Sequence, residues 1–327
     1  MLINIVYIIV GIALVIWGAD RLTEGASSLA RGMHVPEIVI GLTIVAAGTS
    51  APELFVSLMS ALKGTSDLAV GNVIGSNIFN TALIVGCSAV IAPMAVAKST
   101  VKKDIPWAAM ASFLLFLLCF DDMNSPHLWG NEISRSDGLI LLVGFLAFMI
   151  YTFNTAKKAG MMPSEEELED LRELPKDYSK LGQNIFWIIL GLGCLVLGSD
   201  LFVDAASYVA HRFGIRQSVV GLTIVAGGTS LPELATSVVA AYKGRSAIAI
   251  GNVIGSNVFN ILLILGLTAV VHPMRIMGIT IVDLTMMLVS MGLLWMFAFT
   301  KYYVSRREGF VLIAGFLAYM GWLLYLL

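Results

Sequence analysis

The sequence contains one 46-residue segment twice. Residues 41–86 align without a gap with residues 221–266, at an offset of 180 residues, and 30 of the 46 positions are identical. Each copy carries Gly-Thr-Ser-x-Pro-Glu in the middle of an otherwise apolar run. Identity at this level within one chain indicates an internal duplication, so we expect a fold built from two similar halves.

The composition places both halves in a membrane. The chain of 327 residues is 58% hydrophobic and 13% charged, whereas soluble domains carry about 25% charged residues. The net charge of −2 offers no basic patch suited to nucleic acid. Cys87, Cys119 and Cys194 lie in apolar runs without a C-x-x-C spacing, so we expect them to be packing residues. The lipid bilayer is therefore the expected partner, and nucleic acid is not.

Ten stretches are long and apolar enough to cross a bilayer, for which about 20 residues are needed. They span residues 2–20, 36–63, 67–92, 105–120, 136–156, 185–203, 216–243, 247–271, 280–299 and 308–326. The second and seventh are interrupted by Gly-Thr-Ser-x-Pro, and interrupted helices at matching positions of two halves indicate a transporter site. The first lacks the positive start of a signal peptide, so we expect it to be retained.

The duplication divides these ten stretches into two sets of five. Because five is an odd number, the second copy must cross the membrane in the opposite direction to the first. We therefore predict an all-α integral membrane protein of ten transmembrane helices, arranged as two inverted five-helix repeats with broken second and seventh helices. The predicted boundaries are 1–156 for the first repeat, 157–184 for a cytoplasmic linker and 185–327 for the second repeat.

The placement of lysine and arginine predicts the orientation. With the N-terminus outside, fifteen of these residues fall in inside loops and five in outside loops, which is the bias that cytoplasmic loops carry. We expect a multi-pass protein of the plasma (inner) membrane with both termini on the outer face. The linker contains Ser164 and Glu167 at capping-box spacing, which predicts a short solvated helix.

Two glutamates are predicted to lie near the middle of the bilayer. Glu53 comes 17 residues after Pro36, where the chain enters the second stretch, and Glu233 occupies the same position in the second copy. A charged side chain at that depth costs about 2.5–3.5 kcal/mol on insertion scales. A pseudo-two-fold axis in the membrane plane would bring the two carboxylates together, where they require protons or cations.

The surrounding residues offer further oxygen atoms. Pro52 and Pro232 lack an N–H, so each frees a backbone carbonyl in the preceding turn, and such backbone is tolerated at membrane depth only inside protein or at a cavity. Thr and Ser hydroxyls precede each proline. The next helix of each repeat carries a polar stripe at i, i+4 and i+8. The two stripes are Asn72, Ser76 and Asn80, and Asn252, Ser256 and Asn260.

Carboxylates, hydroxyls, amides and carbonyls are ligands for hard cations. Zinc and copper prefer nitrogen and sulfur ligands, which this set lacks. Ca²⁺ accepts six to eight oxygens in a flexible cage, whereas Mg²⁺ dehydrates reluctantly. One Ca²⁺ would balance two ionised glutamates, and Na⁺ is also a hard ion, so both stay candidates. No motif for an organic cofactor accompanies the set.

The paired motif resembles a known family. Gly-Thr-Ser-x-Pro-Glu followed by Gly-Asn-x-x-Gly-Ser-Asn-x-Phe-Asn, in two inverted copies, is similar to the α-repeats of the cation/calcium exchanger superfamily, and most similar to its bacterial sodium/calcium antiporter branch. The resemblance covers essentially the whole chain and implies counter-transport of Na⁺ against Ca²⁺. The ligands that it implies are Ala46, Thr49, Ser50, Glu53, Ser76, Asn80, Ala226, Thr229, Ser230, Glu233, Ser256 and Asn260.

Within this implied set, Ala46 and Ala226 would contribute only backbone carbonyls. Some relatives carry aspartate where this chain has Asn260, so the core here has two acidic ligands. Proton-coupled relatives tend to have asparagine where Thr49 and Thr229 stand, so the hydroxyls of this chain favour sodium.

The expected function is secondary antiport by alternating access, in which the first and sixth helices move across a four-helix core that holds the ions. The alternatives are Ca²⁺/H⁺ exchange or K⁺-dependent Na⁺/Ca²⁺ exchange in the same fold, a cation channel, and an intramembrane enzyme that uses two carboxylates as acid and base. A closed midplane site in an inverted repeat fits a channel poorly, and no nucleophile or cofactor motif supports an enzyme.

The remaining polar residues have structural interpretations. Asp20 and Glu24 match Asp200 and Asp204 near the ends of the first and sixth helices. We expect these four to be interfacial residues facing water, with attraction of cations toward the site as the alternative. The four histidines show no metal-ligand spacing and are expected to be structural.

Overall fold

A computed structural model of the chain describes residues 2–119, 131–161, 181–213, 226–276 and 278–326. The described part is helical apart from two short strand pairs and the connecting turns. The predicted linker helix at Ser164–Glu167 lies outside the described residues.

The described helices of the first half begin with α1 and end with α8. They are α1 (Leu2–Met33), α2 (Glu37–Ile40), η1 (Gly41–Val45), α3 (Ala46–Thr49), α4 (Ala51–Leu62), α5 (Ser66–Ile78), η2 (Phe79–Ile84), α6 (Val85–Ile91), η3 (Thr100–Asp104), α7 (Ile105–Leu118) and α8 (Arg135–Met161). The elements labelled η are π-helical turns, which join their neighbours into longer rods.

The second half repeats this order. Its described helices are α10 (Leu181–Arg212), α12 (Ala226–Thr229), α13 (Leu231–Tyr242), α14 (Ser246–Val258), η5 (Phe259–Leu265), α15 (Gly266–Val271), α16 (Ile281–Lys301) and α17 (Arg306–Leu326). Among the described residues seven helices are long and apolar enough to cross a membrane, and the bent pair formed by residues 37–49 and 51–62 would make an eighth. The chain is thus an all-α protein with the helices of a membrane protein, as predicted.

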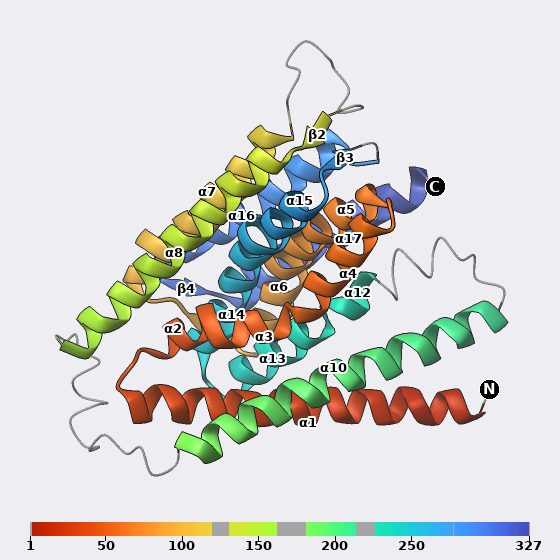
Figure 1. Cartoon of the computed structure of the whole chain (residues 1–327). Helices are drawn as coiled ribbons and strands as arrows, with labels where there is room; N and C mark the ends of the chain where they lie inside the picture. Colours follow the sequence, from red (N-terminus) through yellow and green to blue (C-terminus); the bar gives the residue numbers. More distant parts are fainter. Residues whose placement is uncertain (1, 120–130, 162–180, 214–225, 277, 327) are drawn as a thin grey trace.

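Burial separates central helices from peripheral ones. In the rod Ser66–Ile91, 67% of the most apolar 18-residue window is buried, and in Ser246–Val271 the value is 83%. For α8 and α17 it is 17%. These two peripheral helices expose large apolar side chains such as Leu146 and Leu317, which suit contact with lipid. The two rods that carry the polar stripes therefore form the centre of the molecule (Figure 1).

Helices α1 and α10 run side by side and antiparallel across one side of the molecule (Figure 1). Glycines allow their close approach: a Cβ added at Gly18 would lie 2.7 Å from the carbonyl oxygen of Gly191, and one added at Gly11 would lie 2.7 Å from that of Gly198. Small residues at such crossings are typical of packed membrane helices. The two close contacts are seven residues apart on α1 and seven residues apart on α10, so the helices stay in contact over about two turns.

Both of these helices are longer than the sequence predicts. The apolar stretches end near residues 20 and 203, but α1 continues to Met33 and α10 to Arg212. The charged residues that seemed to end the first stretch lie on the helix and form ion pairs there, so they do not interrupt it. Arg21 and Arg31, expected in an inside loop, accordingly belong to α1.

Two short antiparallel strand pairs, which the sequence does not predict, connect loops from the two halves. Strand β1 (Met94–Ala95) pairs with β4 (Tyr303–Val304), and β2 (Asn131–Ile133) pairs with β3 (Met274–Ile276). Each pair contains one strand from each half of the chain. The strands are two or three residues long, too short for a period-two pattern to be recognised in the sequence.

Candidate functional site

Each Gly-Thr-Ser-x-Pro-Glu motif breaks a helix. Ser50 stands between α3 and α4 with φ −83° and ψ 7°, and Ser230 stands between α12 and α13 with φ −91° and ψ 8°. The proline two residues later lies in the first turn of the new helix, where its missing N–H costs nothing. The break between α3 and α4 bends the helix by 46°. Each glutamate therefore lies in the first turn after a break.

The two glutamates are fully buried and are brought together by crossed contacts. The Ser50 hydroxyl donates to Oε1 of Glu233 at 2.9 Å, and the Ser230 hydroxyl donates to Oε1 of Glu53 at 3.1 Å. Each serine thus binds the carboxylate of the opposite repeat. The other carboxylate oxygen, Oε2, of Glu53 and of Glu233 accepts no hydrogen bond from any residue in the described ranges. Two carboxylates without a described basic partner therefore share one buried site.

The polar stripes of the central rods line the same site. Ser76, Asn80, Ser256 and Asn260 are all at most 4% exposed. The Ser230 hydroxyl contacts that of Ser76 at 3.3 Å, which connects the break of one repeat to the stripe of the other. Neither side-chain atom of Asn260 has a hydrogen-bond partner within the described part of the chain. A buried amide in this condition is available to a ligand.

The remaining predicted ligands lie in the short helices α3 and α12, which precede the two breaks. Thr49 and Ala46 are fully buried, and Thr229 is half-buried beside Glu53. The carbonyl of Ala46 accepts the N–H of Ser50 at 3.0 Å and the Thr49 hydroxyl at 3.4 Å. Ala226 is the first residue of α12.

Asn72 and Asn252 hold the backbone of the glutamates through their side-chain amide N–H groups. The amide of Asn72 donates to the carbonyl of Glu53 at 3.3 Å and to the Ser57 hydroxyl at 3.0 Å. Asn252 repeats this in the second half, at 3.4 Å to the carbonyl of Glu233 and 2.9 Å to Ser237. The sequence places both asparagines on the stripes, but it does not indicate these partners, which lie 15 and 19 residues away.

A set of contacts that the sequence does not indicate connects the two central rods. The Asn80 amide donates to Oδ1 of Asn257 at 3.1 Å, and the Asn257 amide donates to the Thr81 hydroxyl at 2.9 Å. The position that matches Thr81 is Ile261, so the second half has no equivalent contact. The difference between Thr81 and Ile261, at matching positions of the two copies, is the sequence signal for this unequal contact.

The side chains of the site offer mainly oxygen atoms as ligands. Its described side-chain groups are carboxylates, hydroxyls and amides, and no group of three or more His, Cys, Asp or Glu side chains with metal-site geometry occurs among the described residues. Buried, paired carboxylates with oxygen neighbours suit a hard cation. Such a site between broken helices in a duplicated membrane protein defines the class of secondary cation transporters.

Comparison with known proteins identifies the family within this class. The family model described as sodium/calcium exchanger protein matches residues 3–154 and 183–325. The chain therefore belongs to the sodium/calcium exchanger family, which confirms the resemblance found in the motifs.

Individual relatives agree with this assignment over most of their length. The sodium/calcium exchanger MaX1 of Methanosarcina acetivorans is 31% identical over 99% of this chain and 99% of its own. The inner membrane protein YrbG of Escherichia coli is 34% identical over 84% of this chain and 81% of its own. A solved structure of the sodium-calcium exchanger NCX_Mj is 28% identical and covers 98% of this chain and 99% of its own, with a TM-score of 0.83.

Proposed function

We propose that the protein exchanges Na⁺ for Ca²⁺ across the membrane by alternating access. The observation that carries this proposal is the crossed pair of contacts, Ser50 to Glu233 and Ser230 to Glu53, which brings two buried carboxylates from opposite repeats to one site. The relatives named sodium/calcium exchangers support it. The family consists of transporters, not enzymes.

The charge of the site explains why these two ions compete. Two ionised carboxylates in a low-dielectric site repel each other, and one Ca²⁺ or several Na⁺ ions would neutralise them. An empty, doubly charged site opposes movement through the membrane, so transport in either direction requires bound cations. The ligands would be Ala46, Thr49, Ser50, Glu53, Ser76, Asn80, Ala226, Thr229, Ser230, Glu233, Ser256 and Asn260.

The proposed architecture has ten transmembrane helices in two inverted repeats, with boundaries at 1–156, 157–184 and 185–327. Beyond the eight spans recognised by length and composition, the ninth would be η3 with α7, and the tenth would be the broken helix that contains α12 and α13. The membrane would be the plasma (inner) membrane, which the name of the relative YrbG supports. Both termini would lie on its outer face.

Replacement of either glutamate tests the proposal. Glu53→Gln and Glu233→Gln each keep the shape of the side chain but remove one of the two charges, so we expect each to reduce sodium-gradient-driven ⁴⁵Ca²⁺ uptake into vesicles to background. Glu132→Gln, at a partly exposed carboxylate on β2, is the matched control and should transport at the wild-type rate. Uptake at the wild-type rate in either site variant would refute the assignment.

The same vesicles distinguish the alternatives. Uptake driven by a pH gradient in sodium-free medium would favour Ca²⁺/H⁺ exchange, and a requirement for K⁺ would favour K⁺-dependent exchange. Single-channel currents in a planar bilayer would indicate a channel. We expect none of these, and we expect replacement of Na⁺ by K⁺ to stop uptake.

A further inference from the structure

The two halves of the molecule pack differently against the helices that carry the glutamates. At the offset of 180 residues, α1 corresponds to α10 and α13 corresponds to α4. Helix α1 packs along α13, but the equivalent contact between α10 and α4 is marginal at most in the described residues. In alternating access only one face of the site opens at a time, so inverted repeats pack differently in any conformation that is open to one face.

Ion pairs reinforce the tighter of these two contacts. Nζ of Lys243, directly after α13, lies 2.5 Å from Oδ1 of Asp20 and 2.9 Å from Oε1 of Glu24 on α1. Arg21 binds the same two carboxylates at 2.8 and 3.1 Å. Asp20 and Glu24 are spaced i, i+4 and face the same side of α1. We call these four residues the α1 cluster.

Leu201 stands where α1 has Arg21, and the other three equivalent positions carry residues of matching charge that form no ion pair with one another. They are Asp200 and Asp204 on α10 and Lys63 directly after α4. All three are exposed, and no ion pair joins Lys63 to either aspartate. Two like charges at i, i+4 without a cation between them are unfavourable. We call these three residues the α10 cluster.

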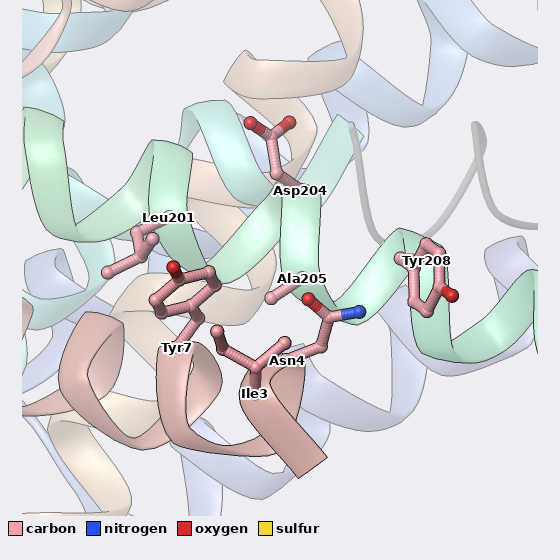
Figure 2. Close-up of a pocket in the computed structure, with 7 residues that line it drawn as sticks. All are labelled: Ile3, Asn4, Tyr7, Leu201, Asp204, Ala205 and Tyr208. Carbon is pink, nitrogen blue, oxygen red and sulfur yellow. The ribbon is translucent and has the colours of Figure 1, made fainter. Parts of the chain in front are cut away.

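The Asp204 carboxylate is exposed and points away from α1 (Figure 2). It borders an open pocket of about 490 Å³ between the start of α1 and the end of α10, lined also by Asn4, Tyr7 and Tyr208. In Figure 2 the Asp204 carboxylate is directed away from Asn4 and Tyr7. The proposed topology places Lys63 on the outer face, where these N-terminal residues of α1 also lie.

We propose that the two clusters alternate during transport, so that Lys243 binds α1 to α13 in the conformation seen here and Lys63 binds α10 to α4 in the opposite-facing one. This makes Lys63 and Lys243 positioning residues for the conformational step, and it rests on the proposed function. Lys243 and Asp20 are 26% and 28% exposed, so the pair is partly hydrated. Ion pairs of this kind are weak enough to exchange repeatedly.

Cysteine cross-linking tests whether both pairings occur. In a chain whose three native cysteines are replaced by alanine, Asp20→Cys with Lys243→Cys reports the α1 cluster, and Asp204→Cys with Lys63→Cys reports the α10 cluster. We expect each pair to cross-link in membrane vesicles, and each link to stop exchange until it is reduced. Failure of the second pair to cross-link under any Na⁺ or Ca²⁺ condition, while the first links, would overturn the proposal.

Removal of one lysine tests whether the pairings compete. Lys243→Gln, combined with the cysteine pair at 63 and 204, should speed cross-linking of that pair about two- to fivefold, the size expected for a partly exposed ion pair. Lys243→Arg keeps the charge and should leave the rate near its original value. Arg275→Gln removes an exposed ion pair with Glu132 elsewhere and should change nothing. An unchanged rate in Lys243→Gln would contradict the proposal.

The two proposals fail separately. Cross-linking does not require ion flux, so alternating links in a protein that does not exchange Na⁺ for Ca²⁺ would refute the transport assignment alone. Exchange that depends on Glu53 and Glu233, with no link between positions 63 and 204, would refute the alternation alone.

Discussion

Asn252 and Asn72 occupy equivalent positions, yet their surroundings differ. Asn252 is fully buried, and besides its two donor contacts its Oδ1 accepts the Thr49 hydroxyl at 3.1 Å. Asn72 is half-buried and makes only the two donor contacts given above. The site is thus supported more firmly from the second repeat than from the first.

Asn252→Leu should therefore be more damaging than Asn72→Leu. The change at 252 removes one partner from each of three buried groups, against two groups at 72, and a buried polar group that stays unsatisfied costs about 1–3 kcal/mol. We expect thermal unfolding in detergent to show a clearly larger loss of stability at 252, accompanied by weaker Ca²⁺ binding. Equal losses in the two variants would show that the extra contact with Thr49 contributes little.

The sequence predicts which residues form the site better than it predicts the hydrogen bonds between them. The proline marks each break, and Glu53 and Glu233 each accept a hydrogen bond from the serine of the other repeat. The inversion of the repeats, which follows from counting spans, stays a prediction. The crossed contacts of Ser50 and Ser230 could not be predicted, since they depend on which repeat each hydroxyl faces. The contact between Asn80 and Asn257 likewise depends on the distance between two rods.

At the scale of elements, the apolar stretches predict where helices lie but not where they end. The extension of α1 carries charged residues that form ion pairs with one another and with Lys243, far away in the sequence, which no local pattern reveals. The extension of α10 has no such pairs among the described residues, and its apolar pattern does not indicate it either. The π-helical turns at Gly41–Val45, Phe79–Ile84 and Phe259–Leu265 are also unpredicted, because a π-turn changes the hydrogen-bond register without a distinctive composition.

The crossing of α1 with α10 gives a matched pair of substitutions on one helix. A Cβ at Gly191 would lie 2.8 Å from the Gly18 carbonyl oxygen, whereas one at Gly193 would have no atom within 4 Å. We expect Gly191→Ala to destabilise the protein by about 1–3 kcal/mol through overpacking. Gly193→Ala should be neutral or slightly stabilising, because alanine favours helix more than glycine by about 1 kcal/mol.

Thermal unfolding of the two variants in the same detergent measures this difference. If Gly191→Ala unfolds at the same temperature as Gly193→Ala, then α1 and α10 are not held at the separation described here. In vesicles, Gly191→Ala should exchange Na⁺ for Ca²⁺ more slowly than Gly193→Ala, because overpacking disturbs the contact between α1 and α10.

At the scale of the whole molecule, the two halves are joined at several levels. The strand pairs β1–β4 and β2–β3 each connect a loop of one half to a loop of the other, and the crossed serines connect the halves at the buried site. Neither half could close the site alone, so we expect the two repeats to fold and function only together.

The length of α1 has a consequence for the membrane that surrounds it. Its 32 residues span about 48 Å, since a helix rises about 1.5 Å per residue. The hydrocarbon layer is only about 30 Å thick, so α1 and the equally long α10 must tilt or protrude, and their tilt must suit the thickness of the bilayer. Any movement of this pair that changes its tilt is therefore sensitive to the lipid.

We accordingly expect the exchange rate to depend on lipid chain length even where ion affinity does not. In vesicles with acyl chains from about 14 to 22 carbons, the rate should pass through a maximum and fall several-fold on either side, because each ångström of mismatch costs a fraction of a kcal/mol. A constant rate across the series would mean that the pair moves without changing its tilt. The bilayer would otherwise act as a regulator of this protein, through thickness alone and without any binding site.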